Sequence, residues 1–114
     1  QVVKLLLEKN ADVNAQGGYY GNALQAASCR GHEQVVKLLL EKNADVNAQG
    51  GHYGNALQAA SYRGYEQVVK LLLEKNADVN AQGGDYGNAL HAASYEGHER
   101  VVRLLLDLGA NDVL

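Results

Sequence analysis

The stretch QVVKLLLEKNADVNAQGG occupies residues 34–51, and the same letters occupy residues 1–18 and 67–84. A degraded fourth copy, RVVRLLLDLGANDVL, runs from Arg100 to Leu114. The copies are spaced by 33 residues, and units of that length account for the whole chain. A period of this size is typical of arrays in which each copy is one small unit stacked on its neighbours.

Each unit predicts two short helices followed by a turn. In the stretch NALQAAS (55–61), Asn55 is a favoured N-cap and the residues after it are helix formers, while Gly64 suits the helix end. A second helix is expected near residues 66–75, where Val68 begins an i, i+3, i+4 apolar pattern. Asn76 suits the position after that helix, and residues 77–87, rich in Gly, Asn and Asp, predict a long turn or hairpin.

The apolar stripe of the second helix is too wide for a helix covered on one side only. It suits a helix packed between neighbours, so the pattern predicts an all-α solenoid of seven helices with no extended sheet. We expect a single domain over residues 1–114. It divides into a half unit (1–16), full units (17–49 and 50–82) and a last unit (83–114).

Composition and charge exclude several classes of partner. The chain has ten Lys and Arg residues and thirteen Asp and Glu residues, which gives a net charge of −3. This charge gives no reason to expect nucleic acid or an anionic membrane as a partner. Cys29 is the only cysteine, so neither an internal disulfide nor a cysteine cluster for zinc can form. The chain shows no signal peptide and no membrane-spanning run. We therefore expect a soluble protein in the cytoplasm.

The stretches GHEQVVKLLLEKNADVNAQ (31–49) and GHERVVRLLLDLGA (97–110) closely resemble ankyrin repeats. The first helix departs from the usual Thr-Pro-Leu-His-x-Ala, because NALQAA stands at 22–27 and 55–60 and NALHAA at 88–93. In this variant the chain resembles the ankyrin arrays of fungal NACHT-type, NLR-like signalling proteins, including those of heterokaryon incompatibility. That resemblance implies a non-enzymatic module that binds another protein, as the partner-sensing array of a receptor. The near-identity of the copies also fits a structural or engineered scaffold with no native partner.

Other motifs have simpler interpretations. The repeated Gly-Gly-x-Tyr-Gly, as at 50–54, lacks the lysine and hydroxyl residue of a phosphate-binding loop, so it predicts a turn. The four histidines, at positions 32, 52, 91 and 98, are expected to be structural or capping residues. No Ser/His/Asp grouping recurs with an orienting partner. We therefore expect no catalysis, no metal and no cofactor.

Tyrosines and variable positions supply the candidate site. Tyr20, Tyr53 and Tyr86 recur at the period and predict a ladder, which packs over the glycine-rich turns or, as the alternative, contacts a partner directly. Three of the five positions that change between copies fall, by resemblance, at the hairpin tip and on the exposed side of the first helix. In ankyrin repeats this is the concave surface that contacts partners. The candidate partner-binding residues are Tyr19, His52 and Asp85; Cys29, Tyr62 and Tyr95; and Arg30, Arg63 and Glu96.

The ends of the chain carry one more expectation. The chain opens and closes on second helices whose apolar residues lack a neighbouring unit within this sequence. Ankyrin arrays normally carry polar caps at both ends. We therefore expect either that the chain is an excerpt of a longer array or that it stacks end to end through the uncapped termini.

Overall fold

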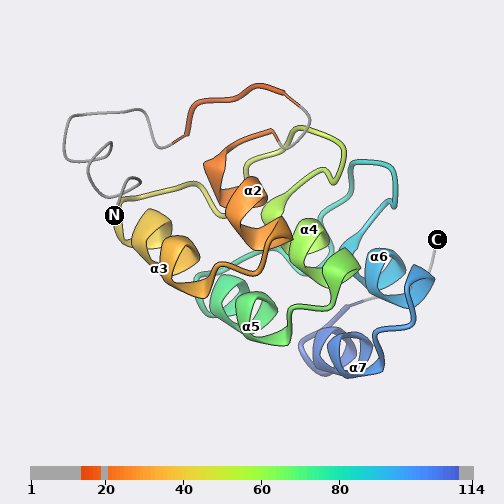
Figure 1. Ribbon diagram of the computed structural model, residues 1–114. Coiled ribbons are helices and arrows are strands. Elements are labelled where there is room, and N and C mark those ends of the chain that lie inside the picture. The colour runs from red at the N-terminus through yellow and green to blue at the C-terminus, as the bar shows by residue number, and fades with distance from the viewer. Residues whose placement is uncertain (1–13, 19–20, 111–114) are drawn as a thin grey trace.

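The computed structural model describes residues 14–18 and 21–110, and within them six helices (Figure 1). They are α2 (Ala23–Cys29), α3 (Glu33–Glu41), α4 (Ala56–Arg63), α5 (Glu66–Glu74), α6 (Ala89–Tyr95) and α7 (Glu99–Asp107). The first helices α2, α4 and α6 form one layer, and the second helices α3, α5 and α7 form the other. The expected all-α solenoid is confirmed. The additional helix expected at the start of the chain falls within residues 1–13, outside the described residues.

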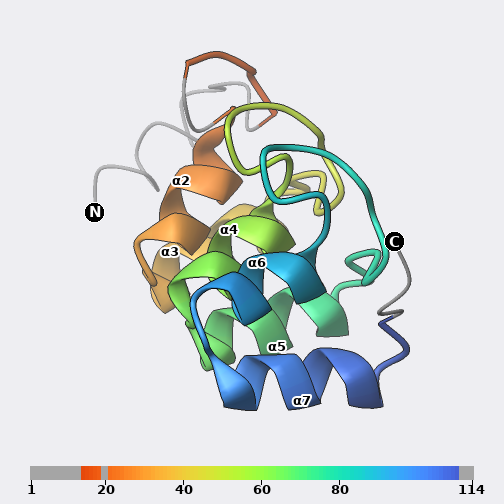
Figure 2. The same ribbon diagram turned by 90° about the vertical axis from the view of Figure 1, so that its right-hand side faces the viewer.

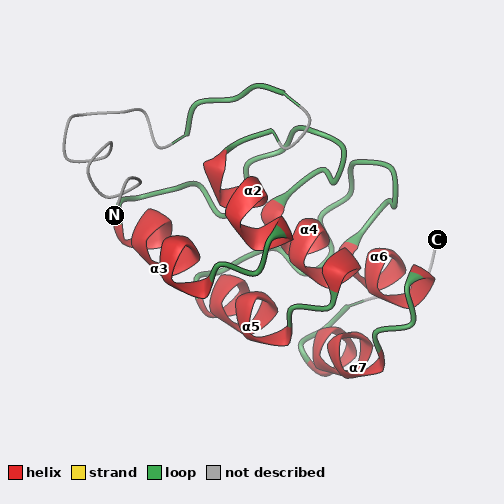
Figure 3. Cartoon of the chain, in the orientation of Figure 1, coloured by secondary structure: helices red, strands yellow, loops and turns green. Residues whose placement is uncertain are grey.

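Long loops connect each second helix to the next first helix, and they extend from the same side of the helical stack (Figure 2). In the described residues they carry isolated β-bridges, between Gly50 and Gly54 and between Gly83 and Gly87, and no strand (Figure 3). Each loop is therefore a hairpin-like turn, as the glycine spacing predicts. The hairpins pack backbone to backbone: a Cβ added to Gly84 would lie 2.5 Å from the carbonyl carbon of Tyr53.

The first helices begin at asparagine caps, as the sequence predicts. The side-chain oxygens of Asn22, Asn55 and Asn88 accept hydrogen bonds from the backbone N–H three residues later, at 2.9, 2.8 and 2.8 Å. Each bond satisfies an N–H group that has no partner inside the helix. Asparagine thus takes over the capping role that threonine has in the usual motif.

The second helices end in left-handed residues. Asn76 has φ 71°, its N–H donates to the carbonyl of Leu73, and the next N–H, of Ala77, donates to the carbonyl of Leu72. This pair of bonds is the Schellman arrangement. The helix itself ends at Glu74, with Lys75 as its C-cap, one residue before the expected end. Gly109 occupies the equivalent position with φ 102°.

A continuous apolar core runs through the stack. Leu39, Leu72 and Leu105, one from each second helix, are at most 1% exposed. Small residues fill the contacts between first helices, where Ala59 and Ala92 are fully buried. These alanines allow the first helices to approach closely, and that close packing brings side chains from adjacent hairpins and helices onto one surface.

Candidate functional site

Four tyrosines from two adjacent repeats form a zigzag of rings, called here the tyrosine column: Tyr53, Tyr62, Tyr86 and Tyr95. Tyr53 and Tyr86 come from hairpins, whereas Tyr62 and Tyr95 come from the ends of α4 and α6. The closest pair, Tyr62 and Tyr86, stacks with ring centroids 4.5 Å apart and planes at 26°. Tyr53 lies 5.5 Å from Tyr62, and Tyr86 lies 5.5 Å from Tyr95. These spacings are those of favourable aromatic pairs.

Burial decreases along the tyrosine column. Tyr53 is 3% exposed and packs with Cys29, while Tyr62 and Tyr86 are half-buried. Tyr95 is 72% exposed. Tyr53 and Tyr86 stack with centroids 6.4 Å apart, so the ladder is confirmed for these two tyrosines, and Tyr20 lies outside the described residues. The column therefore rests on a buried tyrosine and offers partly exposed rings to solvent.

Hydroxyl contacts fix the charge state of the column. Hydrogen bonding to Tyr86, followed by desolvation and hydrogen bonding to Glu96, raises the pKa of Tyr62 above its ordinary value of 10.0. Burial, followed by hydrogen bonding to Cys29, raises the pKa of Tyr53 to about 12. Hydrogen bonding to Tyr53 is the main cause that raises the pKa of Arg63. At neutral pH the hydroxyls of Tyr53 and Tyr62 are therefore protonated, and Arg63 is a cation that contacts the column.

Two hairpin tips are joined beside the column. His52 Nδ1 lies 2.7 Å from Asp85 Oδ2, and the His52 ring lies edge-on to Tyr53 and to Tyr86 at 5.0 and 5.7 Å. One changing position therefore makes a direct contact between two successive copies. His52 and Asp85 extend the site from the tyrosine rings to the tips of the hairpins.

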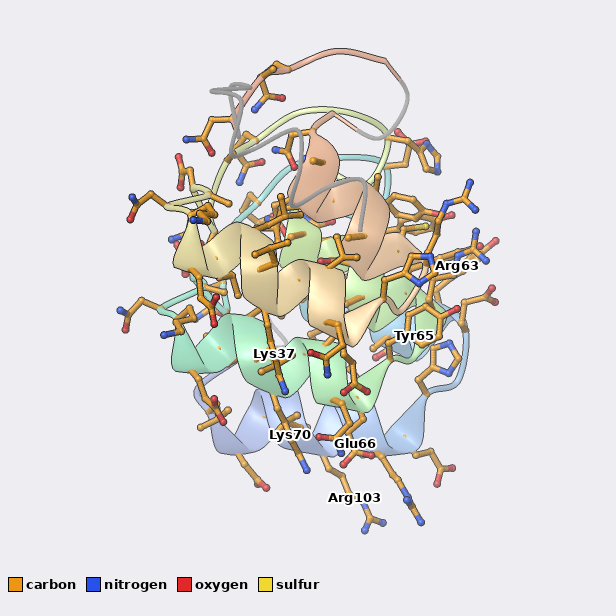
Figure 4. The ribbon with its side chains drawn as sticks, turned by 60° about the vertical axis from the view of Figure 1, so that its left-hand side comes forward. Lys37, Arg63, Tyr65, Glu66, Lys70 and Arg103 are labelled. Carbon is orange, nitrogen blue, oxygen red and sulfur yellow. The ribbon has the colours of Figure 1, made fainter. Side chains whose placement is uncertain are left out.

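On the other side of the column, a hollow of about 350 Å³ lies between the ends of α2 and α4, lined by Cys29, Arg30, His32, Arg63 and Tyr65. Figure 4 shows Arg63 and Tyr65 together at one edge of the molecule, away from Lys37 and Lys70 on the second helices. We call this feature the arginine hollow. Its charged groups belong to two neighbouring repeats, so it exists only in the assembled stack.

Most of the predicted site residues come together on this surface. His52 and Asp85 bond at the hairpin tips, Tyr62 and Tyr95 belong to the column, and Arg30 and Arg63 line the hollow. Glu96 contacts Tyr62. Tyr19 lies outside the described residues. This surface of hairpin tips, column and hollow is called here the hairpin-side face.

The expectation that Cys29 lies on the exposed side of its helix is wrong. Its side chain is only 2% exposed, because it packs beneath Tyr53 of the following repeat. Tyr62 and Tyr95 occupy the same position in later copies and extend past the equivalent cover into the tyrosine column. Cys29 therefore supports the face from below and borders the hollow with only a small exposed fraction.

The candidate set omits four residues of the face: Tyr53, Tyr86, His32 and Tyr65. The sequence predicts Tyr53 and Tyr86 as a packing ladder, but they do not vary between copies, so variation does not mark them as partner contacts. His32 and Tyr65 do vary, at the fourth changing position. That variation was the available signal, since four of the five changing positions border the face. The fifth is fully buried at Gln25 and Gln58 and partly exposed at His91.

The histidine at the start of α7 has a structural role, as expected. His98 Nε2 lies 2.9 Å from the carbonyl oxygen of Tyr62, in the last turn of α4, and its ring covers Gly64. The imidazole thereby caps a carbonyl that the helix leaves without a partner. Among the described residues, no three His, Cys, Asp or Glu side chains gather in a group that could hold a metal ion.

The fold and the face define a class of protein, a solenoid of two-helix repeats with a shared surface of hairpins and first helices. A family model described as ankyrin repeats in three copies matches residues 52–113, and a second, for many copies, matches residues 1–39 and 23–73. The chain belongs to the ankyrin repeat family. No curated protein matches it.

Ankyrin repeats are generally modules for protein–protein interaction and are typically not enzymes. None of the helices in the described part of the chain combines the length and apolar character needed to cross a membrane.

Proposed function

We propose that this array binds another protein through the hairpin-side face, which corresponds to the concave surface of ankyrin repeats. One observation carries the proposal: three repeats that are otherwise almost identical differ mainly where that face lies. Four of the five changing positions border the tyrosine column or the arginine hollow. Sequence change concentrated at aromatic and arginine positions favours an interface, because such residues supply most binding energy.

Charge supports a preferred orientation of the partner. Arg30 and Arg63 stand on the first two described repeats, and Asp85 and Glu96 stand on the third. A partner matched to this order carries acidic groups at one end and basic groups at the other, with an apolar feature on the rings between them. Exposed charges mainly steer association, whereas the rings supply affinity.

The family resemblance extends the proposal to a biological setting. We propose that the array is the partner-sensing part of an NLR-like signalling receptor, which acts inside the cell. The near-identity of residues 1–33, 34–66 and 67–99 favours a second candidate, a structural or engineered scaffold with no native partner. Both candidates share the fold and differ in whether the face is used.

Affinity capture on the immobilised chain tests the two candidates. Proteins retained from extracts of the native host are eluted and rebound to variants whose folding is first checked by circular dichroism. Tyr62→Ala should weaken binding of a true partner by about 1–3 kcal/mol. Lys75→Ala, at the end of α5, is the control and should have little effect. Equal retention by both variants contradicts the face, and no retained protein favours the scaffold.

A further inference from the structure

The arginine hollow differs in charge from three other hollows in the described part of the chain. Two of its five lining residues are arginines and a third is a histidine, and no carboxylate is among them. Three other hollows, of about 400–450 Å³, each include a glutamate: Glu33, Glu66 or Glu99. The arginine hollow is therefore a place where an anion meets cations without a competing carboxylate in the lining.

We propose that the arginine hollow seats the side-chain carboxylate of an acidic peptide segment, whose neighbouring apolar side chain packs on the tyrosine column. The proposal rests on the proposed function and names the chemistry of its partner. Guanidinium groups suit this role because their planar fork of N–H donors matches the two oxygens of a carboxylate. Arg63 is already oriented by its hydrogen bond to Tyr53. The Arg63 side chain therefore loses less conformational entropy when a peptide binds.

The hollow and the column are close enough for one short peptide. Arg63 contacts Tyr53, and the Tyr53 ring lies 5.5 Å from Tyr62. An extended chain advances about 3.3 Å per residue, so a carboxylate and an apolar side chain a few residues apart reach both. The peptide thus uses charge and aromatic packing together.

The hollow lies where two first helices end and two second helices begin. Arg30 is the C-cap of α2 and Arg63 is the last residue of α4, while His32 and Tyr65 are the N-caps of α3 and α5. The partial charges of these helix ends oppose one another, so the two arginine side chains supply the charge that selects an anion.

The hollow also sets the register of the bound segment. In a nearly identical array, a peptide has equivalent seats one repeat apart. One repeat further along, however, Arg63 and Glu96 take the places of Arg30 and Arg63, and the glutamate repels a carboxylate. Among the described copies, the arginine pair therefore occurs at one step of the stack. The change from Arg63 to Glu96 therefore distinguishes one step of the stack from the next by charge.

The test uses terminally blocked, fluorescent hexapeptides and the full chain at low ionic strength, with binding followed by fluorescence anisotropy. Each peptide carries Phe and, one to three residues before it, Glu, Gln, Lys or phosphoserine. The Glu peptide should bind about three- to fivefold more tightly than the Gln peptide. Arg30→Gln should remove that preference. Lys42→Gln removes the same charge at the C-cap of α3 and should keep the preference. Glu96→Arg completes a second arginine pair and should strengthen binding of the Glu peptide.

Several outcomes overturn the proposal. Equal affinity for Glu and Gln peptides, no detectable binding of the Glu peptide, or equal losses in Arg30→Gln and Lys42→Gln each contradict a carboxylate seat. Binding of the phosphoserine peptide alone assigns the hollow to phosphopeptides instead. Tyr62→Ala separates the two proposals. If it weakens all peptides while Glu and Gln bind equally, the face stands and the hollow fails. If it changes none, the face itself is wrong.

Discussion

His52 and Asp85 connect two successive hairpins through both side chain and backbone. His52 Nδ1 lies 2.7 Å from Asp85 Oδ2, and the Asp85 backbone N–H donates to the His52 carbonyl at 3.0 Å. Since the carboxylate only accepts, the Nδ1 position must carry the proton. Residues that vary between copies thus make a specific inter-repeat link. Variation here changes the stiffness of the hairpin-side face as well as its chemistry.

Replacing Asp85 with asparagine tests this link. The backbone bond survives in Asp85→Asn, but the charged acceptor is lost. Because Asp85 is largely exposed, we expect a loss of only about 0.2–1 kcal/mol in the free energy of unfolding, and a smaller loss at high salt. Urea denaturation at two ionic strengths measures both effects. A loss that does not change with salt would show that charge plays no part in the link.

Asn47 forms a second inter-repeat clamp, on the turn that follows α3. Its Oδ1 accepts from the Asp78 N–H at 2.7 Å, and its Nδ2 donates to the Asn76 carbonyl at 3.1 Å. Asn47→Ala removes both bonds and should destabilise the chain by about 1–2 kcal/mol. Asn47→Asp keeps the acceptor and should lose less. Urea denaturation of the two variants compares them, and equal losses would contradict the view that the acceptor half contributes.

Helix ends were predictable because their chemistry is local. Asn55 caps α4 and Asn76 ends α5 through backbone groups only a few residues away. The local sequence is therefore sufficient to predict these helix ends. The tyrosine column was not predictable in the same way. It joins Tyr53 and Tyr86 from hairpins with Tyr62 from a helix, and that meeting depends on how closely repeats stack.

The burial of Cys29 also could not be predicted from the sequence. Its position on the helix suggests exposure, and Tyr95 at the equivalent position is 72% exposed. A thiol is short enough to lie beneath Tyr53 of the next repeat, whereas a phenol extends beyond that cover. Burial at this position depends on the size of the side chain and on the packing of the neighbouring repeat. The periodicity of the helix predicts neither of these.

Stacking of the repeats makes a prediction about stability. Leu72 in α5 is fully buried between neighbours, whereas Leu106 in α7 is 45% exposed. Leu72→Ala should cost about 2–5 kcal/mol, through lost transfer free energy and the cavity left behind. Leu106→Ala should cost much less, since part of its surface is already in water. Thermal and urea denaturation of both variants measures this. Equal costs would contradict a stack in which stability comes from flanking units.

The raised pKa of Tyr53 predicts a loss of stability at alkaline pH. Burial holds this pKa at about 12, against an ordinary value of 10.0. Between these values the unfolded chain releases the proton while the folded chain retains it, so unfolding becomes more favourable as the pH rises. The stabilising contribution is complete below pH 10 and is lost progressively up to about pH 12.

Tyr53→Phe isolates this contribution, because it removes the hydroxyl and keeps the ring that packs on Cys29 and Tyr62. Below pH 10 the free-energy difference between wild type and variant should be constant. Above it, the wild type should lose stability faster than Tyr53→Phe, since only the wild type has this proton to release on unfolding. Alkaline titrations of groups that do not interact with the Tyr53 hydroxyl, including that of Tyr62, occur in both proteins and cancel in the difference. Urea denaturation at a series of pH values gives that difference directly, and tyrosinate absorbance of the folded proteins locates the titration. Parallel stability curves up to pH 12 would mean that the Tyr53 hydroxyl ionises as easily in the folded protein as in water, and that the ring is not buried beneath the column.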